Sequence, residues 1–466
     1  MGNLMSPPVK SSLHRYAAIA MSQSRPISTI NTDSRARRTM GVVFFTIIMD
    51  IVGFSIIFPL YPSMLTYYLG REGDSGILGA LLGFLERFDS VAGGGVVVLF
   101  GGVLGSMYAI LQFVGAPIFG AVSDRIGRKP ILLFSLSGLA ISYGLWIVAG
   151  QFWILLVARL VGGLMSSNIS TATAVVADIT TPDKRARGMA MVGMALGLGF
   201  MLGPALGGLA AGWDWAAQWP ELERFGINPF SFPAALAAAL AIINVMFVAF
   251  AFQETRDPSV APSSVSRTAN PIALFRTADY PGVSQTNWTY FIFLAAFSGM
   301  EFSITFLALE RFGYGPRGIA LMLLFAGVIL AGMQGGYVRR MSGRIGPRRM
   351  AFHGLAFTIP GLVVVGSASQ PWMAFAGLGL MAVGSAQVIP CLTALVSMYA
   401  AADDQGRILG VFRSLGSLAR ALGPLLACVI YWRLGGATAY YVVAVLMVVP
   451  LIMARYLPEP TPLASE

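Results

Sequence analysis

A lone carboxylate interrupts a long apolar run of this sequence. Asp50 lies between "FFTIIM" and "IVGFSIIF", and Glu301 lies similarly within "SGMEFSITFL". In a membrane helix such a carboxylate costs roughly 2.5–3.5 kcal/mol on insertion scales, so a function is the first hypothesis. A carboxyl group that is costly to keep charged can take up and release a proton, as a proton-coupling site requires. The alternative is a static carboxylate satisfied by a neighbouring Ser or Arg.

Two arginines also lie inside apolar segments, Arg159 in "LLVARLVGG" and Arg420 in "SLGSLARALGP". A guanidinium group stays charged in proteins and binds carboxylates in a fixed geometry. Arg159 could therefore pair with a proton-coupling carboxylate, or could reach lipid headgroups from the edge of the membrane. Arg420 is a candidate for binding an anionic substrate or for pairing with Glu301.

Uncharged polar residues within the apolar segments have two possible roles. Amide side chains there either join helices or contact a ligand. Gln112, Asn168 and Gln334 are candidates for a substrate cavity together with Arg420, and Asn168 and Gln334 are the better of these amides.

Residue types that support cofactor or metal chemistry are scarce. The chain has two histidines and two cysteines, and Cys391 and Cys428 lie in apolar segments, which disfavours a disulfide framework or a metal site. It contains no HExxH motif and no Gly-Lys pair of a phosphate-binding loop. The glycine-rich stretch 197–203 lies inside an apolar helix without a preceding strand, so it is not a dinucleotide site. We expect no metal, no cofactor and no enzymatic activity, and transport driven by an ion gradient or by the substrate's own gradient.

The composition indicates how these residues must be positioned. Of 466 residues, 56% are hydrophobic and only 11% are charged. The chain therefore has too few polar side chains to form the surfaces of soluble domains. Apolar segments of about 20 residues recur, the length needed to cross a bilayer as a helix. The sequence predicts an all-α membrane protein with twelve spanning helices, at 39–64, 99–121, 131–149, 152–176, 189–211, 232–253, 287–308, 318–338, 350–367, 372–398, 408–431 and 438–456.

The basic residues gather on one side of this predicted topology. Cytoplasmic segments carry more Lys and Arg than external ones, which places both termini in the cytoplasm and explains the net charge of +10 without nucleic acid. The groups are Arg35, Arg37 and Arg38; Arg125, Arg128 and Lys129; Lys184, Arg185 and Arg187; and Arg339, Arg340, Arg344, Arg348 and Arg349.

The polar segments also divide the chain. We expect a disordered cytoplasmic tail over 1–38 and a first six-helix bundle over 39–253. A Pro- and Ser-rich cytoplasmic linker over 254–286 leads to a second bundle over 287–457 and a tail over 458–466.

The two halves are similar to each other. "PDKRARGMAMVGMALGLGFMLGP" (182–204) aligns with "ADDQGRILGVFRSLGSLARALGP" (402–424), and "RIGRKP" aligns with "RIGPRR". "MDIVGFSIIFPL" laid over "MEFSITFLAL" pairs Asp50 with Glu301. Six helices per repeat give parallel halves related by an axis along the membrane normal, with a substrate site between them at the midplane.

A short charged turn, "GAVSDRIGRKP" (120–130), separates two apolar segments. Gly120 permits close helix approach, Gly127 can adopt a positive φ, and Asp124 can accept hydrogen bonds from a helix N-terminus. Arg125, Arg128 and Lys129 hold the turn at the membrane surface. The pattern G-x-x-x-D-R-x-G-R-K resembles the loop 2–3 signature of the major facilitator superfamily. The second half has Gly343 at the position of Asp124, so the gating contact is expected in one half only.

Other segments resemble one branch of that superfamily, the tetracycline-resistance-like drug:proton antiporters. "FFTIIMDIVGFSIIFPLYP", "LLVARLVGG" and "GFMLGPALGG" are similar to their helix 1, helix 4 and helix 5 patterns. The second half is most similar to an organic-anion exporter branch also found in animals. The resemblance implies proton transfer at Arg159, a gating pair between Asp178 and Arg125, and an antiporter motif made of Gly199, Gly203, Pro204, Gly207, Gly423 and Pro424.

These expectations describe a proton-coupled exporter of amphipathic organic compounds, such as drugs or organic anions, that works by alternating access. The alternative is facilitated or proton-symport uptake of a small organic solute. The expected partners are a small-molecule substrate, protons and the lipid bilayer, without nucleic acid. We expect a monomer with several membrane spans, in the inner or plasma membrane if the source is bacterial.

Overall fold

The computed structural model describes residues 29–73, 75–86, 95–180, 182–256, 280–400 and 405–459. The predictions for the tail over 1–28, for the linker over 257–279 and for the end over 460–466 therefore lie outside the described residues. Residues 29–38, predicted as part of the disordered tail, instead belong to the first helix, which extends beyond the apolar segment. Within them all regular structure is helical, and twelve helices are long and apolar enough to cross a membrane. The predicted all-α membrane fold with twelve spanning helices is confirmed.

The first bundle contains the first six spans. They begin with α2 (Thr29–Ser55), which continues through the 3₁₀ turn η1 (Phe58–Leu60) into α3 (Tyr61–Glu72). The other spanning elements are α5 (Gly95–Ile126), α6 (Arg128–Ile147), α7 (Phe152–Met165), α8 (Asn168–Ile179), α9 (Pro182–Ala210) and α11 (Ser231–Ala251). Three short elements join them, α4 (Gly76–Glu86), α10 (Trp215–Gln218) and η2 (Pro220–Phe225).

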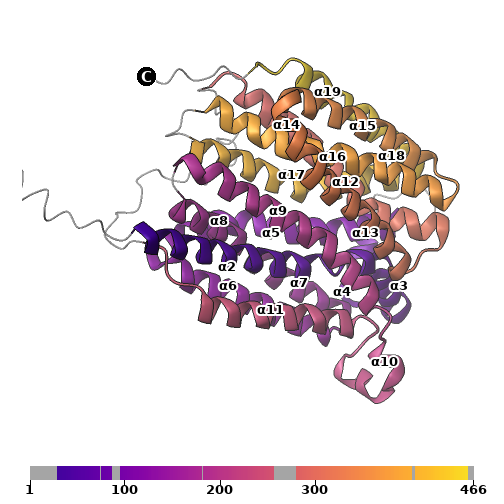
Figure 1. Ribbon diagram of the computed structural model, residues 1–466. Helices are drawn as coiled ribbons and strands as arrows, with labels where there is room; N and C mark the ends of the chain where they lie inside the picture. The colour runs from indigo at the N-terminus through magenta and orange to yellow at the C-terminus, as the bar shows by residue number, and fades with distance from the viewer. Residues whose placement is uncertain are drawn as a thin grey trace, which may run out of the picture.

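The second bundle contains the other six spans. They comprise α12 (Val283–Phe312), α13 (Pro316–Gly332), the π-helical segment η4 (Met333–Val338), α14 (Arg339–Ile345), α15 (Pro347–Ser367), α16 (Pro371–Tyr399), α17 (Gln405–Leu434), α18 (Gly436–Leu446) and α19 (Val448–Arg455). Figure 1 shows the two bundles side by side, the first in indigo to magenta and the second in orange to yellow.

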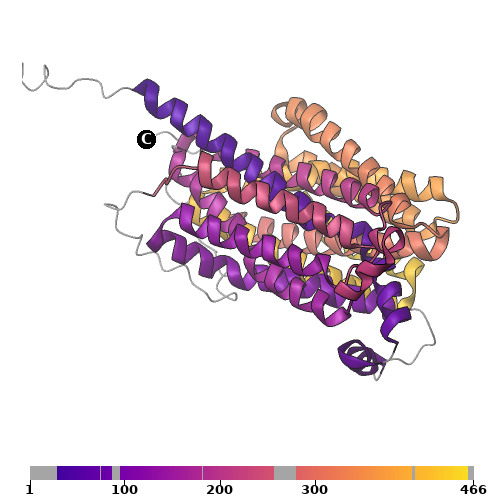
Figure 2. The same ribbon diagram turned by 90° about the horizontal axis from the view of Figure 1, so that it is seen from below.

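Both ends of the described chain lie at the same end of the molecule, which we call the terminal side (Figure 1). The opposite end, the loop side, carries α10, which projects beyond the spanning helices. It also carries α4, the short purple helix that lies apart from the bundles in Figure 2. An even number of spans returns the described chain to the terminal side.

Small residues bring the first and fifth spans of the first bundle close together. A Cβ added at Gly203 of α9 would lie 1.9 Å from Oγ of Ser55 in α2, and one at Gly199 would lie 2.6 Å from Ile51. The Ser55 hydroxyl donates to the carbonyl oxygen of Gly199 at 3.1 Å. The predicted antiporter glycines therefore form the contact face between α9 and α2, and Pro204 lies within the continuous helix.

The second bundle repeats this contact between α17 and α12. A Cβ added at Gly423 would lie 2.3 Å from Oγ of Ser298, and Pro424 again lies within a continuous helix. Gly299 packs against Ala427 in the same way that Gly207 packs against the backbone of Ile56 in the first bundle. The internal repeat predicted for these helices is thus visible as repeated packing.

The packing corrects one part of the internal alignment. Ser298 takes the place of Ser55, so the position equivalent to Asp50 is Phe293 and not Glu301. The predicted pairing of Asp50 with Glu301 is wrong in register. Apolar helices align almost equally well at several offsets, whereas the glycine contacts fix one offset because only small residues fit there.

The two bundles meet most closely on the loop side. A Cβ added at Gly102 of α5 would lie 2.6 Å from Cβ of Cys428, and one at Gly105 would lie 3.0 Å from the ring of Phe302. Gly208 of α9 similarly packs against Ala320 of α13. On the terminal side, by contrast, an added Cβ would meet open space at the interface-helix glycines Gly193, Gly335, Gly336 and Gly410.

Candidate transport site

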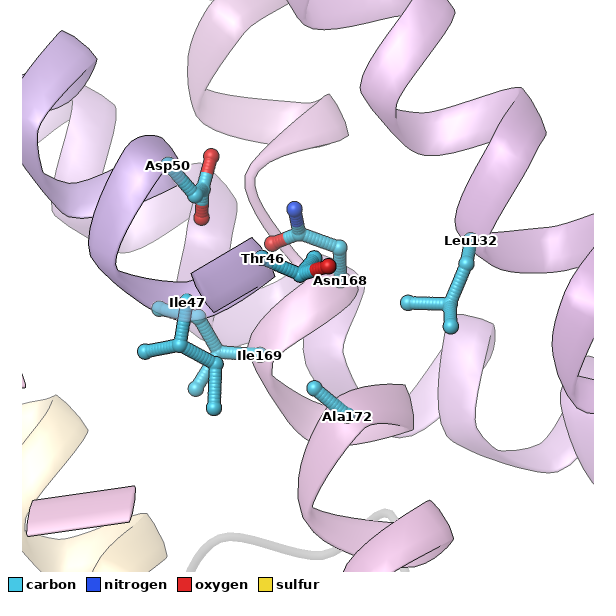
Figure 3. A pocket seen from close by; sticks show the side chains of 7 residues that line it. All are labelled: Thr46, Ile47, Asp50, Leu132, Asn168, Ile169 and Ala172. Carbon is cyan, nitrogen blue, oxygen red and sulfur yellow. The ribbon is translucent and has the colours of Figure 1, made fainter. Parts of the chain in front are cut away.

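Asp50 belongs to α2 and faces α8 inside the first bundle. Only 7% of the residue is exposed, and it makes no ion pair within the described part of the chain. The side-chain amide of Asn168 faces its carboxyl group, as Figure 3 shows. They border a crevice too narrow to admit a water molecule, whose other lining residues are Thr46, Ile47, Leu132, Ile169 and Ala172.

A break in the fourth span positions Asn168. The helix stops at Met165 and starts again at Asn168, which is buried. The Gln112 amide donates to the carbonyl oxygen of Ser166 at 3.1 Å, and the Ser167 hydroxyl donates back to the Gln112 carbonyl oxygen at 3.3 Å. Gln112 and Asn168, both predicted to line a substrate cavity, therefore make these contacts within the first bundle.

Arg159 is buried in α7, with 1% exposed. Its guanidinium carbon lies 4.8 Å from the ring centroid of Trp146 and 6.0 Å from that of Tyr108, so cation–π contacts partly replace water. Its Nε and Nη2 atoms have no hydrogen-bond partner among the described residues. This burial excludes the alternative in which Arg159 reaches the lipid headgroups.

Arg420 of α17 reaches across to the first bundle. Its guanidinium carbon lies 4.9 Å from the ring centroid of Phe200 in α9. Arg420 and Phe200 are equivalent positions of the internal repeat, and two positions related by a two-fold axis can touch each other only close to that axis. Arg420 therefore lies near the axis between the bundles, where it also interacts electrostatically with Glu301.

Aromatic rings surround this central position. Phe200 lies 6.1 Å from both Phe54 and Phe58 of the first span, measured between ring centroids. Tyr61 lies 5.2 Å from Phe302 of the second bundle. Arg420 is thus a cation next to an apolar aromatic wall, an arrangement suited to an amphipathic anion.

Gln334 is the second predicted cavity residue that faces the other bundle. A Cβ added at Gly197 of α9 would lie 3.9 Å from its Oε1 atom. Gln334 belongs to the π-helical segment η4, and such segments within α-helices are frequent at functional sites. Of the four predicted cavity residues, Gln334 and Arg420 are thus the two with these contacts across the interface.

The charged turn on the terminal side forms an ion-pair cluster. Arg128 begins α6 directly after Gly127, whose φ of 120° confirms the predicted positive value. Its guanidinium group lies 2.5 Å from Asp124 and 2.9 Å from Asp178. Gly120 is buried nearby and accepts a hydrogen bond from Ser123 through its carbonyl oxygen.

This cluster corrects the predicted gating pair. Asp178 pairs with Arg128, whereas the prediction paired it with Arg125. The turn at Gly127 directs the first side chain of α6 back toward α5 and α8, while Arg125, in the last turn of α5, is exposed. The Arg125 carbonyl oxygen accepts a hydrogen bond from the Arg256 guanidinium group.

Glu254 is a site residue that the sequence analysis did not single out. Its carboxylate accepts from the backbone N–H groups of Arg128 at 2.9 Å and Lys129 at 3.0 Å, so Glu254 and not Asp124 caps α6. Burial alone would raise the pKa of Glu254, but four backbone N–H donors hold it below its usual value. Lys129 in turn donates from Nζ to the carbonyl oxygen of Ala249 at 2.8 Å. An acidic residue just beyond the last apolar position of a span was the available signal.

Known proteins match this chain along nearly its full length. Residues 43–341 and 318–466 match the family "Major Facilitator Superfamily". The chain is 33% identical over 460 residues to mouse major facilitator superfamily domain-containing protein 10, covering 92% of this chain and 95% of that protein. It is 29% identical over 398 residues to the class C tetracycline resistance protein of Escherichia coli, covering 85% of this chain and 90% of that protein.

A solved structure agrees with the sequence matches. The crystal structure of the human organic anion transporter MFSD10 (TETRAN) superposes with a TM-score of 0.71 at 32% identity. The match covers 90% of this chain and 99% of that one. These relatives are transporters and not enzymes, as the sequence predicted. By full-length similarity and by its twelve-span fold, the chain belongs to the major facilitator superfamily.

Proposed function

We propose that this protein exports amphipathic organic anions in exchange for protons by alternating access. The observation that carries the proposal is the burial of Asp50 in a membrane span without a counter-charge in the described part of the chain. A carboxyl group held there favours the neutral form, and it can release its proton when its surroundings change. Asp50 would thus be the coupling site.

The substrate class follows from the central position. Arg420 offers a permanent positive charge beside Phe200, so an anion with an apolar body fits better than a cation. The human relative is described as an organic anion transporter and the bacterial relative as a tetracycline resistance protein, which supports the same class. Gln334 would contribute a hydrogen bond across the interface.

Alternating access would use the two bundles as rigid halves. The bundles are closed on the loop side and leave open space at interface glycines of the terminal side, as in a state that exchanges substrate there. We assign the terminal side to the cytoplasm because the basic residues gather there. Arg159 would stabilise the deprotonated site electrostatically, and Glu301 would compete with the substrate for Arg420. Both halves belong to one chain, so a monomer would suffice.

The test uses purified protein in proteoliposomes with an imposed pH gradient. A panel of p-aminohippurate, 8-anilinonaphthalene sulfonate, tetracycline and the cation tetraphenylphosphonium is added, and internal pH and compound uptake are followed. We expect compound-dependent dissipation of the gradient for anions, its loss in Asp50→Asn, and weaker anion transport in Arg420→Gln than in Arg420→Lys. Gradient-independent flux, unchanged in Asp50→Asn, would favour the alternative of a facilitated carrier. Cotransport of protons and solute in the same direction would favour uptake.

A further inference from the structure

The first bundle contains buried polar atoms that have no hydrogen-bond partner among the described residues. Buried polar groups in folded proteins are nearly always satisfied, often by internal water, so each such atom calls for an explanation. These atoms are Thr46 Oγ1, Ser106 Oγ, Tyr108 OH, Tyr143 OH, Trp146 Nε1, Arg159 Nε and Nη2, Asn168 Oδ1, Thr171 Oγ1 and Asn244 Oδ1.

These atoms follow one another along the bundle. Arg159 precedes Asn168 by nine residues in the fourth span, about 13 Å along the helix axis, on the loop side of Asp50. Thr46 lies one helical turn from Asp50 toward the terminal side, and the Asn244 amide donates to its carbonyl oxygen at 3.0 Å. The polar atoms therefore extend from Asp50 in both directions.

Tyr143 lies next to the first span, close to Asp50 along the chain of that helix. A Cβ added at Gly53 would lie 3.2 Å from the Tyr143 hydroxyl oxygen, so this hydroxyl lies directly against α2. Gly53 is three residues after Asp50 and thus shares its helix face. Tyr143 interacts electrostatically with both Asp50 and Arg159.

The neighbouring residue holds Tyr143 in this place. The Ser142 hydroxyl donates to the carbonyl oxygen of Ala158 at 2.8 Å, which joins α6 to α7 beside Arg159. Tyr108 flanks the same region from α5, where its ring stacks on Phe54 with centroids 4.8 Å apart. The Tyr143 hydroxyl thus lies against the face of α2 that carries Asp50, and its neighbour Ser142 is bonded to α7 next to Arg159.

We propose that these side chains, bridged by single water molecules, form a proton path confined to the first bundle, with Tyr143 as its relay between the loop side and Asp50. This inference rests on the proposed proton coupling. The substrate would follow a separate route along the axis between the bundles, past Arg420 and Phe200.

In the relay step, a hydronium ion that enters from the loop side gives a proton to the Tyr143 hydroxyl on the Arg159 side and becomes water, as the hydroxyl gives its own proton toward the Asp50 carboxylate. One O–H bond forms as another breaks, so the phenol stays neutral, and Asp50 ends protonated. The hydroxyl then rotates back. Because the crevice at Asp50 is too narrow for water in this conformation, release toward Thr46 requires the bundle to rearrange. This requirement would couple proton exit to the conformational change.

The test compares Tyr143→Phe with Tyr440→Phe. Both changes remove only a hydroxyl group, but the Tyr440 hydroxyl lies in the second bundle and is hydrogen-bonded to Ser303 and to the Met300 carbonyl oxygen. Two fluxes are measured in proteoliposomes with the panel anion that the wild type carries fastest. One is anion transport driven by a pH gradient, and the other is anion–anion counterflow at equal pH, which needs no net proton transfer.

We expect Tyr143→Phe to slow gradient-driven transport by roughly 100-fold or more, since a positioned proton-transfer group contributes about 10²–10⁴-fold, while counterflow stays near the wild-type rate. Tyr440→Phe should change neither flux. Deuterated water should slow gradient-driven transport, but not counterflow, in the wild type and in Tyr440→Phe alike.

Each other outcome has a definite meaning. If the wild type shows no proton-driven flux, the proposed function fails, and the relay fails with it. If the wild type is proton-coupled and Tyr143→Phe remains equally coupled, only the relay is overturned. Loss of both fluxes in Tyr143→Phe would make the residue structural and would also overturn the relay.

Discussion

The two halves of the molecule make the same turn on the terminal side with different chemistry. In the first half the turn between α5 and α6 contains Gly127, with φ 120°, and in the second half the turn between α14 and α15 contains Gly346, with φ 84°. In each case a helix begins at the next residue, Arg128 or Pro347. The backbone shape of the repeat is therefore preserved in both halves.

The charges around the two turns differ. The Arg128 side chain is 8% exposed and contacts two carboxylates, and Glu254 caps the helix that it begins. In the second half, Gly343 stands where Asp124 would be, and Arg348, 32% exposed, pairs at 3.5 Å with Glu459, which is 77% exposed. Ion pairs in water contribute little to stability, whereas a buried pair is costly to break. The charges at the first turn thus link α5, α6 and α8 through buried ion pairs. The second turn has only an exposed ion pair, so there the helices are held mainly by their packing.

The two turns should differ most in how much stability the protein loses when one arginine of each turn is replaced by glutamine. We expect Arg128→Gln to lower the free energy of unfolding by about 2–3 kcal/mol, because Asp124 and Asp178 lose their shared cation. Arg348→Gln should change it by less than about 0.5 kcal/mol. SDS-driven unfolding in mixed micelles measures both values. Equal losses in the two variants would contradict a one-sided cluster.

Removing the charge of Glu254, which caps α6, should reduce the stability by a smaller amount. We expect Glu254→Gln to destabilise the protein by about 1–2 kcal/mol at neutral pH, because a neutral amide oxygen accepts the backbone hydrogen bonds less strongly. Folding lowers the pKa of Glu254, so its contribution is present above the ordinary carboxyl pKa and is lost as pH falls through the lowered value. The difference from wild type should persist at pH 7 and shrink below about pH 4. A difference that grows on acidification would exclude this role.

The smallest effect should follow from restoring the acidic residue in the second half. Gly343→Asp introduces a carboxylate, but Met398 stands at the position equivalent to Asp178, so a second partner is lacking. We expect a change in stability below about 1 kcal/mol and no change in transport rate. Stabilisation as large as the loss in Arg128→Gln would show that one acidic residue is enough to build the cluster.

The sequence predicted the fold well because the signals for it are local. Apolar length defined the spans, and the glycine pattern around Gly203 and Gly423 identified the repeat through residues that tolerate close packing. The apolar residues around Glu301 carried no such restriction, so the register of that helix was wrong.

The sequence identified which residues belong to the candidate site better than it identified the residues that each of them contacts. Asp50, Arg159 and Arg420 were identified because charge in an apolar span is costly. Which bundle or neighbour each one faces depends on tertiary packing, as Gln112 illustrates by bonding within its own bundle. The role of Glu254 depends on a helix far away in the sequence, which local pattern could not reveal.

The contact between Gly102 and Cys428 makes the reactivity of a native thiol a measure of how often the two bundles separate on the loop side. Cys428 and Cys391 are its only thiols, and both are buried. Cys428 is covered by the facing bundle on the loop side, so it would meet a water-soluble maleimide only while the bundles part there. The rate at which Cys428 is labelled from the loop side would therefore report how often the bundles separate there, without an engineered cysteine. In the Cys391→Ser variant, Cys428 would be the one thiol left to react.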